Sequence, residues 1–327
     1  MKKLLFAVFV ISCAVAAFAQ QPAHETVSSS ARVFAKDGED VLTRFPSKYL
    51  ADGARVNIIL PAGYDGAYAR YPVVYIISDE AFDKARIAQT WKIGDKVIFV
   101  SLNMTPGDKA AFLTKEFLPY IETNYKAEDS PQKRILAAAG ADAVEMLALL
   151  SSQPGIFQNA ALLLQDTTPV PTLGPGLDTR LKIYAAGRLS NIARLQMELE
   201  RGGLKFTQNF VSKIYMPSES TPSWQQLDFR YFLTPADFAA KSIAAYLSAD
   251  KIPFEGAHAD LRLDVKTKAG TLNYIPAELK FSPPFLDWDP SAARLTVIPG
   301  ATPGKVKISA PLYFYKKGVN TSLQIVE

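Results

Sequence analysis

Cysteine and histidine are almost absent from this sequence. Cys13 is the single cysteine among 327 residues, and the two histidines are His24 and His258. Beyond residue 13 the chain therefore has no disulfide framework, no thiolate nucleophile and no cysteine-ligated zinc site. The stretch from residue 25 to residue 257 contains no imidazole that could act as a general base.

Clusters of one charge sign and cofactor motifs are also missing. Lys2 and Lys3 contribute two of the net +4 charges, which leaves +2 for the rest of the chain, and no Lys/Arg cluster marks a nucleic-acid binder. Neither G-x-G-x-x-G nor G-x-x-x-x-G-K-[ST] occurs, so we expect no cofactor. Hydrophobic residues make up 48% and charged residues 21% of the chain, which excludes a disordered chain, a collagen-like repeat and a coiled coil.

The first 19 residues resemble a secretory signal peptide. Two lysines precede the apolar run 4–11, and Ala17-Phe18-Ala19 forms an A-x-A site before Gln20. The run is too short to span a membrane, so we expect no transmembrane span and an exported, periplasmic or extracellular protein. An alternative takes residues 10–13 as a lipobox, which would leave a lipid anchor on Cys13.

The middle of the chain alternates strand-like and helix-like segments. A polar leader at 20–30 precedes them, and we assign 31–249 to an α/β domain with a doubly wound, mostly parallel sheet. The expected strands are Arg55–Leu60, Pro72–Ser78, Val97–Leu102, Arg134–Ala139, Ala160–Leu164, Leu181–Ala186 and Phe206–Tyr215. The expected helices are Lys109–Tyr125, Asp142–Gln153, Ser190–Arg201 and Pro235–Leu247.

From residue 250 to 327 the texture changes to short alternating segments separated by Pro and Gly turns. Apolar residues alternate with polar ones at 261–265, 295–297 and 306–308, which predicts a small all-β, sandwich-like domain. Its aromatic residues could form sugar platforms or belong to the core. They are Tyr274, Phe285, Trp288, Tyr313, Phe314 and Tyr315. Because residues 313–315 occupy both faces of one strand, at least one ring should lie on an outer face or at an interface.

Several stretches in the α/β part occur in the order and spacing of a known family. They are VNIILPAGYD at 56–65, YPVVYII at 71–77, EFLPYIETNY at 116–125, the strand–turn–helix around Gly140, and PGIF at 154–157. Together they resemble the esterase branch of the α/β-hydrolases, which includes enterochelin esterases, esterase D-like enzymes and mycolyltransferases. The resemblance covers about residues 55–247 and implies an α/β-hydrolase-like fold.

The catalytic positions of that family are not preserved. Its nucleophile elbow reads G-x-S-x-G, whereas this chain has Gly140-Ala141-Asp142-Ala143-Val144, which we read as an aspartate in the place of serine. Thr221 lies closest to the family's histidine position, and residues 187–190 offer no carboxylate at its acid position. Since a hydroxyl nucleophile needs an adjacent base, an ordinary Ser-His-Asp esterase is excluded.

Asp142 admits two interpretations. It could be a nucleophile or base, provided that water is activated nearby, and His258 would reach it only if the boundary segment folds back. It could instead cap the following helix, where a carboxylate suits the positive end of the dipole. Asp79, Glu80 and Glu145 could join it in an acidic ligand pocket at the carboxyl ends of the strands. Without a supporting histidine we expect no metal site.

Two functional hypotheses follow. The first is an exported, esterase-like pseudoenzyme that binds or scaffolds a small-molecule, carbohydrate or envelope-protein ligand. The second is an active hydrolase of ester type with a non-standard site centred on Asp142. The two differ in whether a base or an activated water lies within hydrogen-bond reach of Asp142.

Overall fold

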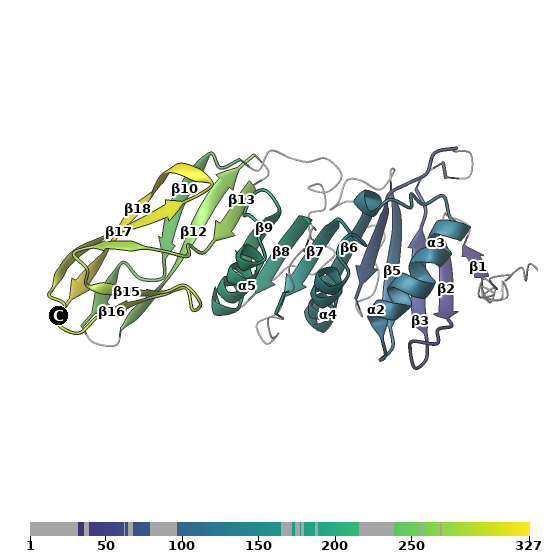
Figure 1. The fold of residues 1–327 in the computed structure, drawn as a ribbon, viewed down its shortest axis with the longest axis horizontal. Helices are drawn as coiled ribbons and strands as arrows, with labels where there is room; N and C mark the ends of the chain where they lie inside the picture. The colour runs from purple at the N-terminus through teal and green to yellow at the C-terminus, as the bar shows by residue number, and fades with distance from the viewer. Residues whose placement is uncertain are drawn as a thin grey trace, which may run out of the picture. The chain divides into compact units, whose positions relative to one another are not determined.

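A nine-stranded sheet forms the scaffold of the chain before residue 216. In this computed structural model we describe residues 32–35, 39–61, 63–64, 68–78, 97–164, 172–173, 177, 180–186, 189–215, 239–254, 257–268 and 270–327. The strand order is β1-β2-β3-β5-β4-β6-β7-β8-β9 (Figure 1). The strands are β1 (Arg32–Ala35), β2 (Glu39–Phe45), β3 (Ala54–Ile59), β4 (Val73–Ile77), β5 (Ile98–Met104), β6 (Arg134–Ala139), β7 (Asn159–Leu164), β8 (Arg180–Ala186) and β9 (Phe210–Tyr215).

The expectation of a mostly parallel α/β sheet is confirmed. All neighbours from β5 through β4, β6, β7 and β8 to β9 are parallel, while β1, β2, β3 and β5 pair antiparallel. The expected strand at Phe206–Tyr215 begins only at Phe210. Strands β1 and β2 were not expected. The segment that joins β4 to β5 lies outside the described residues, so helices on the second face of the sheet remain a prediction.

Three helical connections follow strands β5, β6 and β8. They are the run α2 (Lys109–Ala111), η2 (Phe112–Phe117) and α3 (Leu118–Asn124), then α4 (Gly140–Ser152) and α5 (Leu189–Arg201). The expected helix at 109–125 is thus interrupted by a π-helical turn just before Pro119, which has no N–H to donate. All three connections advance in the same direction along the sheet, so right-handed crossovers place them on one face (Figure 1).

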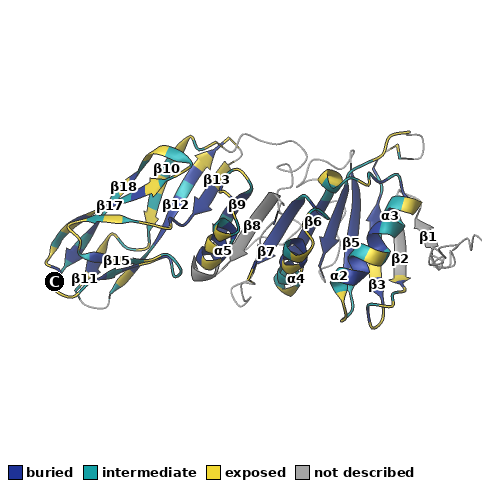
Figure 2. Cartoon of the chain, viewed as in Figure 1, coloured by how far each residue is buried: buried dark blue, intermediate teal, exposed yellow. Residues whose placement is uncertain are grey.

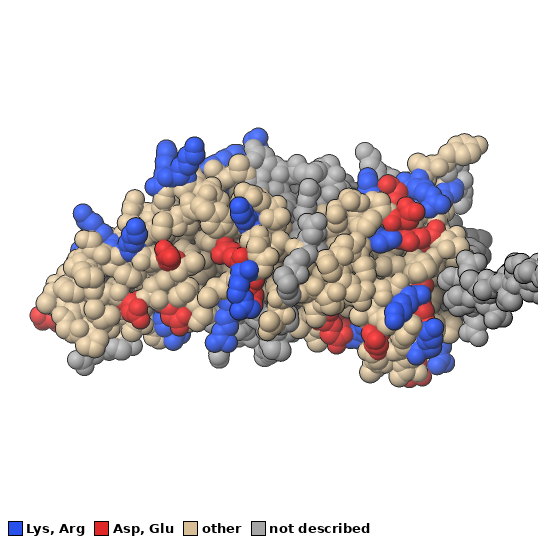
Figure 3. All heavy atoms as spheres, viewed as in Figure 1, with Lys and Arg blue, Asp and Glu red and all other residues tan. Residues whose placement is uncertain are grey.

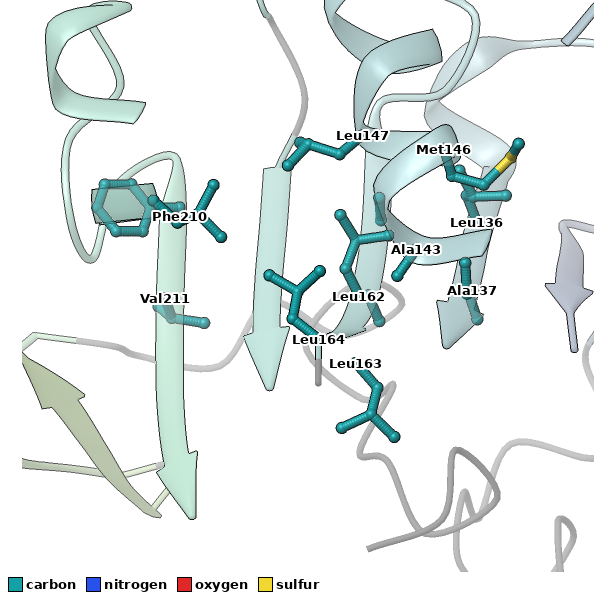
Figure 4. Close-up of a cluster of buried hydrophobic side chains, with 14 of the residues drawn as sticks. Leu136, Ala137, Ala143, Met146, Leu147, Leu162, Leu163, Leu164, Phe210 and Val211 are labelled. Atoms are coloured by element: carbon teal, nitrogen blue, oxygen red, sulfur yellow. The ribbon is translucent and has the colours of Figure 1, made fainter. Parts of the chain in front are cut away.

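The core between α4 and the sheet is fully apolar. Ala143, Met146 and Leu147 project from α4 toward β6 and β7 (Figure 4), and each is completely buried. Every residue of β4 is buried too, as expected of a strand covered on both faces (Figure 2). Burial of this kind contributes about 25 cal/mol for each Å² of apolar surface removed from water. No helix within the described ranges is both long and apolar enough to cross a bilayer.

The expected helix at Pro235–Leu247 is wrong over its second half. Residues 242–247 form strand β10, which pairs antiparallel with the strand at 258–267. Ser242, Ala244 and Tyr246 are exposed and the residues between them are half-buried, which is the period of two that a strand requires. The Ala-rich sequence favours a helix by propensity, but pairing with a neighbouring strand outweighs it.

The described residues from 242 to 327 form two further sheets. One has the order β10-β12-β16-β15 with β13 also beside β12, and the other has the order β11-β18-β17-β14. The expected alternation is confirmed, since the apolar residues at 261–265, 295–297 and 306–308 are buried. The strands are β10 (Ser242–Leu247), β11 (Lys251–Pro253), β12 (His258–Thr267), β13 (Gly270–Tyr274), β14 (Lys280–Ser282), β15 (Leu286–Asp289), β16 (Arg294–Val297), β17 (Gly304–Leu312) and β18 (Tyr315–Val326).

Asn273 of β13 closes the free edge of β9. Its side-chain Oδ1 accepts a hydrogen bond of 2.8 Å from the backbone N–H of Ile214, and its carbonyl oxygen accepts one of 2.6 Å from Ser212 Oγ. Asn273 Nδ2 in turn donates to Asp264 Oδ1 at 2.7 Å. Because an open strand edge exposes unpaired N–H and C=O groups, this contact satisfies a donor that would otherwise be buried without a partner.

Glu200 of α5 holds the β17–β18 hairpin. The hydroxyls of Tyr274 and Tyr313 each donate to Glu200 Oε1 at 2.9 Å, and Tyr313 Oη accepts a bond of 2.7 Å from the N–H of Phe206. Burial raises the pKa of Glu200 above its ordinary value, although the two tyrosine hydrogen bonds act in the opposite direction. The rings of Phe206, Tyr274 and Phe314 pack beneath this cluster with centroids 4.8–5.0 Å apart.

Candidate functional site

The turn between β6 and α4 has its apex at Gly140. This residue has φ of 61°, in the left-handed region, while Ala139 before it is extended with φ of −130° and ψ of 152°. In a nucleophile elbow the reactive side chain belongs to the residue at the sharp strand-to-helix turn. The sequence alignment placed Asp142 at that apex, and the backbone instead puts Asp142 two residues later, in the first turn of α4. A glycine tolerates the left-handed conformation because it has no Cβ.

Asp142 forms an ion pair with Lys109. Lys109 Nζ donates to Asp142 Oδ1 at 2.6 Å and lies 3.0 Å from Glu145 Oε2. The side chains of Lys109 and Asp142 are 16% and 24% exposed, whereas that of Glu145 is 51% exposed. Asp142 and Glu145 therefore face the same way on α4, since both contact one ammonium group.

The N-cap of α2 positions Lys109 for this contact, and the contact sets its charge. The side chain of Asp108 accepts the N–H of Ala111 at 2.9 Å and so caps α2, whose first residue is Lys109. Burial by itself would lower the pKa of Lys109, but its hydrogen bonds to Asp142 and Glu145 and their negative charges outweigh that effect and raise the pKa. Lys109 is therefore a cation at neutral pH.

The charges of this cluster restrict its chemistry. Asp142 is held in place by its hydrogen bond to Lys109, and a carboxylate oxygen that accepts from an ammonium group is less available as a nucleophile or base. Asp142 does not cap α4 either, because the N-cap residue is Ala139 and no side chain forms the cap hydrogen bond. Its carboxylate instead bonds to Lys109 and so links α4 to α2. Acidic and basic side chains lie interspersed over the α2–α4 part of the surface (Figure 3). Among the described residues, no group of three or more His, Cys, Asp or Glu side chains could hold a metal ion.

The other predicted site residues lie either outside the described residues or in another sheet. Asp79, Glu80 and Thr221 lie outside the described residues, as do positions 187 and 188. His258 is an exposed residue of β12, opposite Thr296 of β16, and so belongs to a different sheet from the one that carries Asp142.

The aromatic residues of the C-terminal part belong mainly to the core. Tyr274 is 2% exposed, and Trp288 Nε1 donates to the carbonyl of Pro276 at 3.0 Å. Tyr313 is 55% exposed, but its hydroxyl bonds to Glu200 of α5. Residues 313 and 314 form the turn between β17 and β18, so the expectation of one strand through 313–315 is wrong, although the ring of Tyr313 does lie at a contact with α5. Phe285, Trp288 and Phe314 are half-buried and pack against the core, which favours the core interpretation for these residues.

Sequence reasoning missed Lys109 as a partner of Asp142. The two residues are 33 positions apart, and no local pattern links them. The one available signal is that the expected helices begin at Lys109 and Asp142, each directly after an expected strand. Glu200 was missed for the same reason, because its tyrosine partners lie 74 and 113 residues away.

Comparison with known proteins gives likeness to solved structures alone. No protein-family model matches the chain, and no curated protein matches it. A ferulic acid esterase from Anaeromyces mucronatus aligns over 58% of this chain and 88% of its own, with 15% identity and a TM-score of 0.41. An S-formylglutathione hydrolase from Staphylococcus aureus aligns over 60% and 94%, with 10% identity and a TM-score of 0.40.

An IroE-like serine hydrolase from Shewanella oneidensis aligns over 56% of this chain and 75% of its own, with 18% identity and a TM-score of 0.38. The proteins named here are ester or serine hydrolases. Likeness of this strength does not assign the chain to a family or to an activity, so the function has to be argued from the chain's own residues.

Proposed function

We propose that this protein is an esterase-like pseudoenzyme that binds or scaffolds a ligand and has no Ser-His-Asp catalysis. One observation carries the proposal. The residue at the strand-to-helix apex, where an α/β-hydrolase holds its nucleophile, is Gly140, with φ of 61° and no side chain. A position without a side chain offers no atom to attack a substrate carbonyl.

The neighbouring groups support the same conclusion. Asp142 is the nearest carboxylate along the chain, and it is bonded to Lys109 at 2.6 Å. The sequence supplies no histidine between residues 25 and 257, and His258 is an exposed residue of another sheet. A hydrolase that loses its nucleophile or its base loses roughly 10⁶-fold in kcat.

The sequence supports further proposals on location, domain division and ligand. The segment at 1–19 supports export to the periplasm or the exterior, with lipid attachment at Cys13 as the alternative. We propose a division into an esterase-like domain at 31–249 and a sandwich-like domain at 250–327. Strand β10 lies before this boundary in the sequence, but it pairs with β12 and so belongs to the second sheet system. The ligand is a small molecule, a carbohydrate or an envelope protein. Asp79, Glu80 and Glu145 are the residues proposed to contact it.

Ester hydrolysis by purified protein tests the proposal. The substrates are p-nitrophenyl acetate and butyrate, and the variants are Asp142→Asn and, as a matched control on the same helix, Glu145→Gln. We expect all three proteins to hydrolyse at the rate of the buffer blank. A fluorophosphonate probe, which labels activated serines, should add no mass to the protein.

A different outcome would support the second hypothesis. Turnover that disappears in Asp142→Asn but persists in Glu145→Gln would show that Asp142 is chemical and would overturn the pseudoenzyme proposal. Labelling by the fluorophosphonate would overturn it in another way, because it would show an activated serine elsewhere in the chain.

A further inference from the structure

The two sheets of the C-terminal part differ sharply in charge. Strands β11, β14, β17 and β18 contain no Asp or Glu and six lysines, all of them exposed. These are Lys251, Lys280, Lys305, Lys307, Lys316 and Lys317. The other sheet, built from β10, β12, β13, β15 and β16, has four aspartates against two arginines and one lysine, and its arginines pair with Asp264 and Asp260. A face that serves only for solubility normally mixes both signs, as this second sheet does.

Register places four of the lysines on one surface. In β17, Lys305 and Lys307 are exposed while Val306 and Ile308 between them are buried, so both lysines point away from the core. Lys305 pairs with Gln324 of β18, which pairs in turn with Lys251 of β11. Lys280 of β14 lies opposite Ser309, one position further along β17 on the same face.

The backbone positions of the four lysines form a diagonal row across this sheet. Same-face neighbours along a strand are about 7 Å apart, and adjacent strands are about 4.8 Å apart. Lys305 and Lys307 are therefore separated by one such step, and Lys251 lies two strands away from Lys305 at the same level. No ion pair in the described part of the chain includes any of the four. Their charges are thus not neutralised by neighbouring carboxylates.

Protection of sheet edges does not account for the row. Lysines on edge strands discourage pairing with another chain, and this explains Lys251 in β11 and Lys280 in β14, which are the two edge strands. Lys305 and Lys307 lie in β17, between β14 and β18, where no edge needs protection. The interior position of these two charges points to an anionic partner.

The groups around the lysines indicate the class of partner. The outward positions between them carry hydroxyl and amide side chains, which can donate to and accept from sugar hydroxyls. They are Ser282, Ser309, Asn320, Ser322 and Gln324. At the paired positions 280–282, 305–309 and 320–324 the one aromatic residue is Phe281, which lies opposite the buried Ile308 on the inner face. The surface between the lysines therefore lacks the stacking platform that single-stranded nucleic acid uses. It also lacks the large apolar side chains that insert into a membrane interface.

We propose that the outer face of the β11-β18-β17-β14 sheet binds an acidic polysaccharide, a polymer of sugar units that carry carboxylate or sulfate groups. The row of lysines follows the charges of the polymer, and the hydroxyl and amide side chains bind its sugar hydroxyls. Lysine is a point charge without the bidentate geometry of arginine, so binding depends strongly on ionic strength. This assignment does not rest on the pseudoenzyme proposal and holds for an active hydrolase as well.

Calorimetric titration with polygalacturonate tests the proposal, with its methyl ester as the neutral polymer of the same backbone. The test variant is the double substitution Lys305→Gln/Lys307→Gln. Its matched control is Lys241→Gln/Lys266→Gln, which removes the same charge from exposed positions on the β10–β12 side. We expect binding to polygalacturonate alone, a rise in Kd of about tenfold in the test variant, and less than about a twofold change in the control.

Three results would overturn the proposal. Equal weakening in both double variants would show that net charge alone drives binding. Binding of the methyl ester as tightly as the acid would remove the electrostatic basis. Equal affinity for anionic lipid vesicles or single-stranded DNA, lost in the same test variant, would replace the polysaccharide with a general anionic surface. Thermal unfolding of each variant checks that the fold is intact, which is expected because the substituted side chains are exposed.

The outcome is separable from the test of catalysis. Failure of the pseudoenzyme proposal shows itself as ester turnover and leaves polysaccharide binding unchanged. Failure of the present proposal shows itself as absent or charge-insensitive binding to polygalacturonate, and says nothing about Asp142.

Discussion

Lys109 donates a hydrogen bond of 2.6 Å to Asp142 and so joins the start of α2 to the first turn of α4. The two residues are 33 positions apart and belong to connections that lie on the same face of the sheet. Because both side chains are mostly buried, the pair is screened less by water than an exposed ion pair would be. It is therefore a contact between helices whose removal can be measured.

The first prediction concerns the two acidic partners of Lys109. Asp142→Asn should lower the free energy of unfolding by about 1–2 kcal/mol, because a neutral amide oxygen accepts more weakly from an ammonium group. Glu145→Gln should cost about 0.5 kcal/mol or less, because exposed ion pairs contribute little. Urea unfolding at neutral pH measures both values. Equal losses in the two variants would show that the ion pair with Asp142 is not the stronger contact.

The second prediction concerns the pH dependence that Glu200 imposes. Burial raises the pKa of this carboxyl group in the folded state, so the folded protein binds more protons than the unfolded chain between the ordinary and the raised pKa. Stability from this group must then rise as the pH falls through the raised pKa. Glu200→Gln has no such titration. The difference in free energy of unfolding, wild type minus variant, should therefore increase on acidification from neutral pH.

Thermal unfolding of both proteins across this pH range gives the measurement. A difference that decreases on acidification would mean that the hydrogen bonds from Tyr274 and Tyr313 outweigh burial and that the pKa of Glu200 lies below its ordinary value.

The third prediction concerns the closed edge of β9. Asn273→Ala removes the acceptor of the Ile214 N–H, a donor in a strand with buried neighbours, and should cost about 1–3 kcal/mol. The control is Asn209→Ala, because Asn209 Oδ1 also accepts a backbone N–H, that of Lys205, but at an exposed turn. The control should cost about 1 kcal/mol or less. Similar losses measured by urea unfolding would argue against a closing role for Asn273.

The fourth prediction tests the conformation of the apex. Gly140→Ala should lower the free energy of unfolding by about 1–2 kcal/mol, since a Cβ strains a left-handed residue. Gly140→Asn should lose less than Gly140→Ala, because asparagine tolerates this region better than other side chains. Chemical unfolding of the two variants gives the comparison. If alanine were tolerated as well as glycine, φ at this position would not be positive in solution.

Local sequence patterns were sufficient to predict the strands whose burial is recorded in their own residues. Strands β4, β5, β6 and β7 are short apolar runs rich in Val, Ile, Leu and Ala, and each was placed to within two residues. The alternating segments of β12, β16 and β17 were recognised from a period of two. The prediction for residues 242–247 was wrong, because Ala and Leu favour a helix and only pairing with β12 makes the segment a strand.

At the candidate site the sequence was not sufficient. The sequence located the strand-to-helix turn at Gly140, but alignment with a five-residue motif cannot say which residue has positive φ. Asp142 was therefore assigned to the apex, while the backbone places Gly140 there. The outer face of the β11-β18-β17-β14 sheet is a similar case. Its lysines are visible in the sequence, but their common surface depends on strand register.

The sequence by itself determined the absence of histidine and cysteine from the α/β part, the alternation of strands and helices, and the change to short strands near residue 250. These properties are local, since they depend on composition and on the period of apolar residues. The tertiary structure decided that Lys109 meets Asp142, that Glu200 receives two tyrosine hydroxyls, and that four lysines share one face. Such contacts join residues far apart in the chain, and packing brings them together because each element must bury its own apolar side.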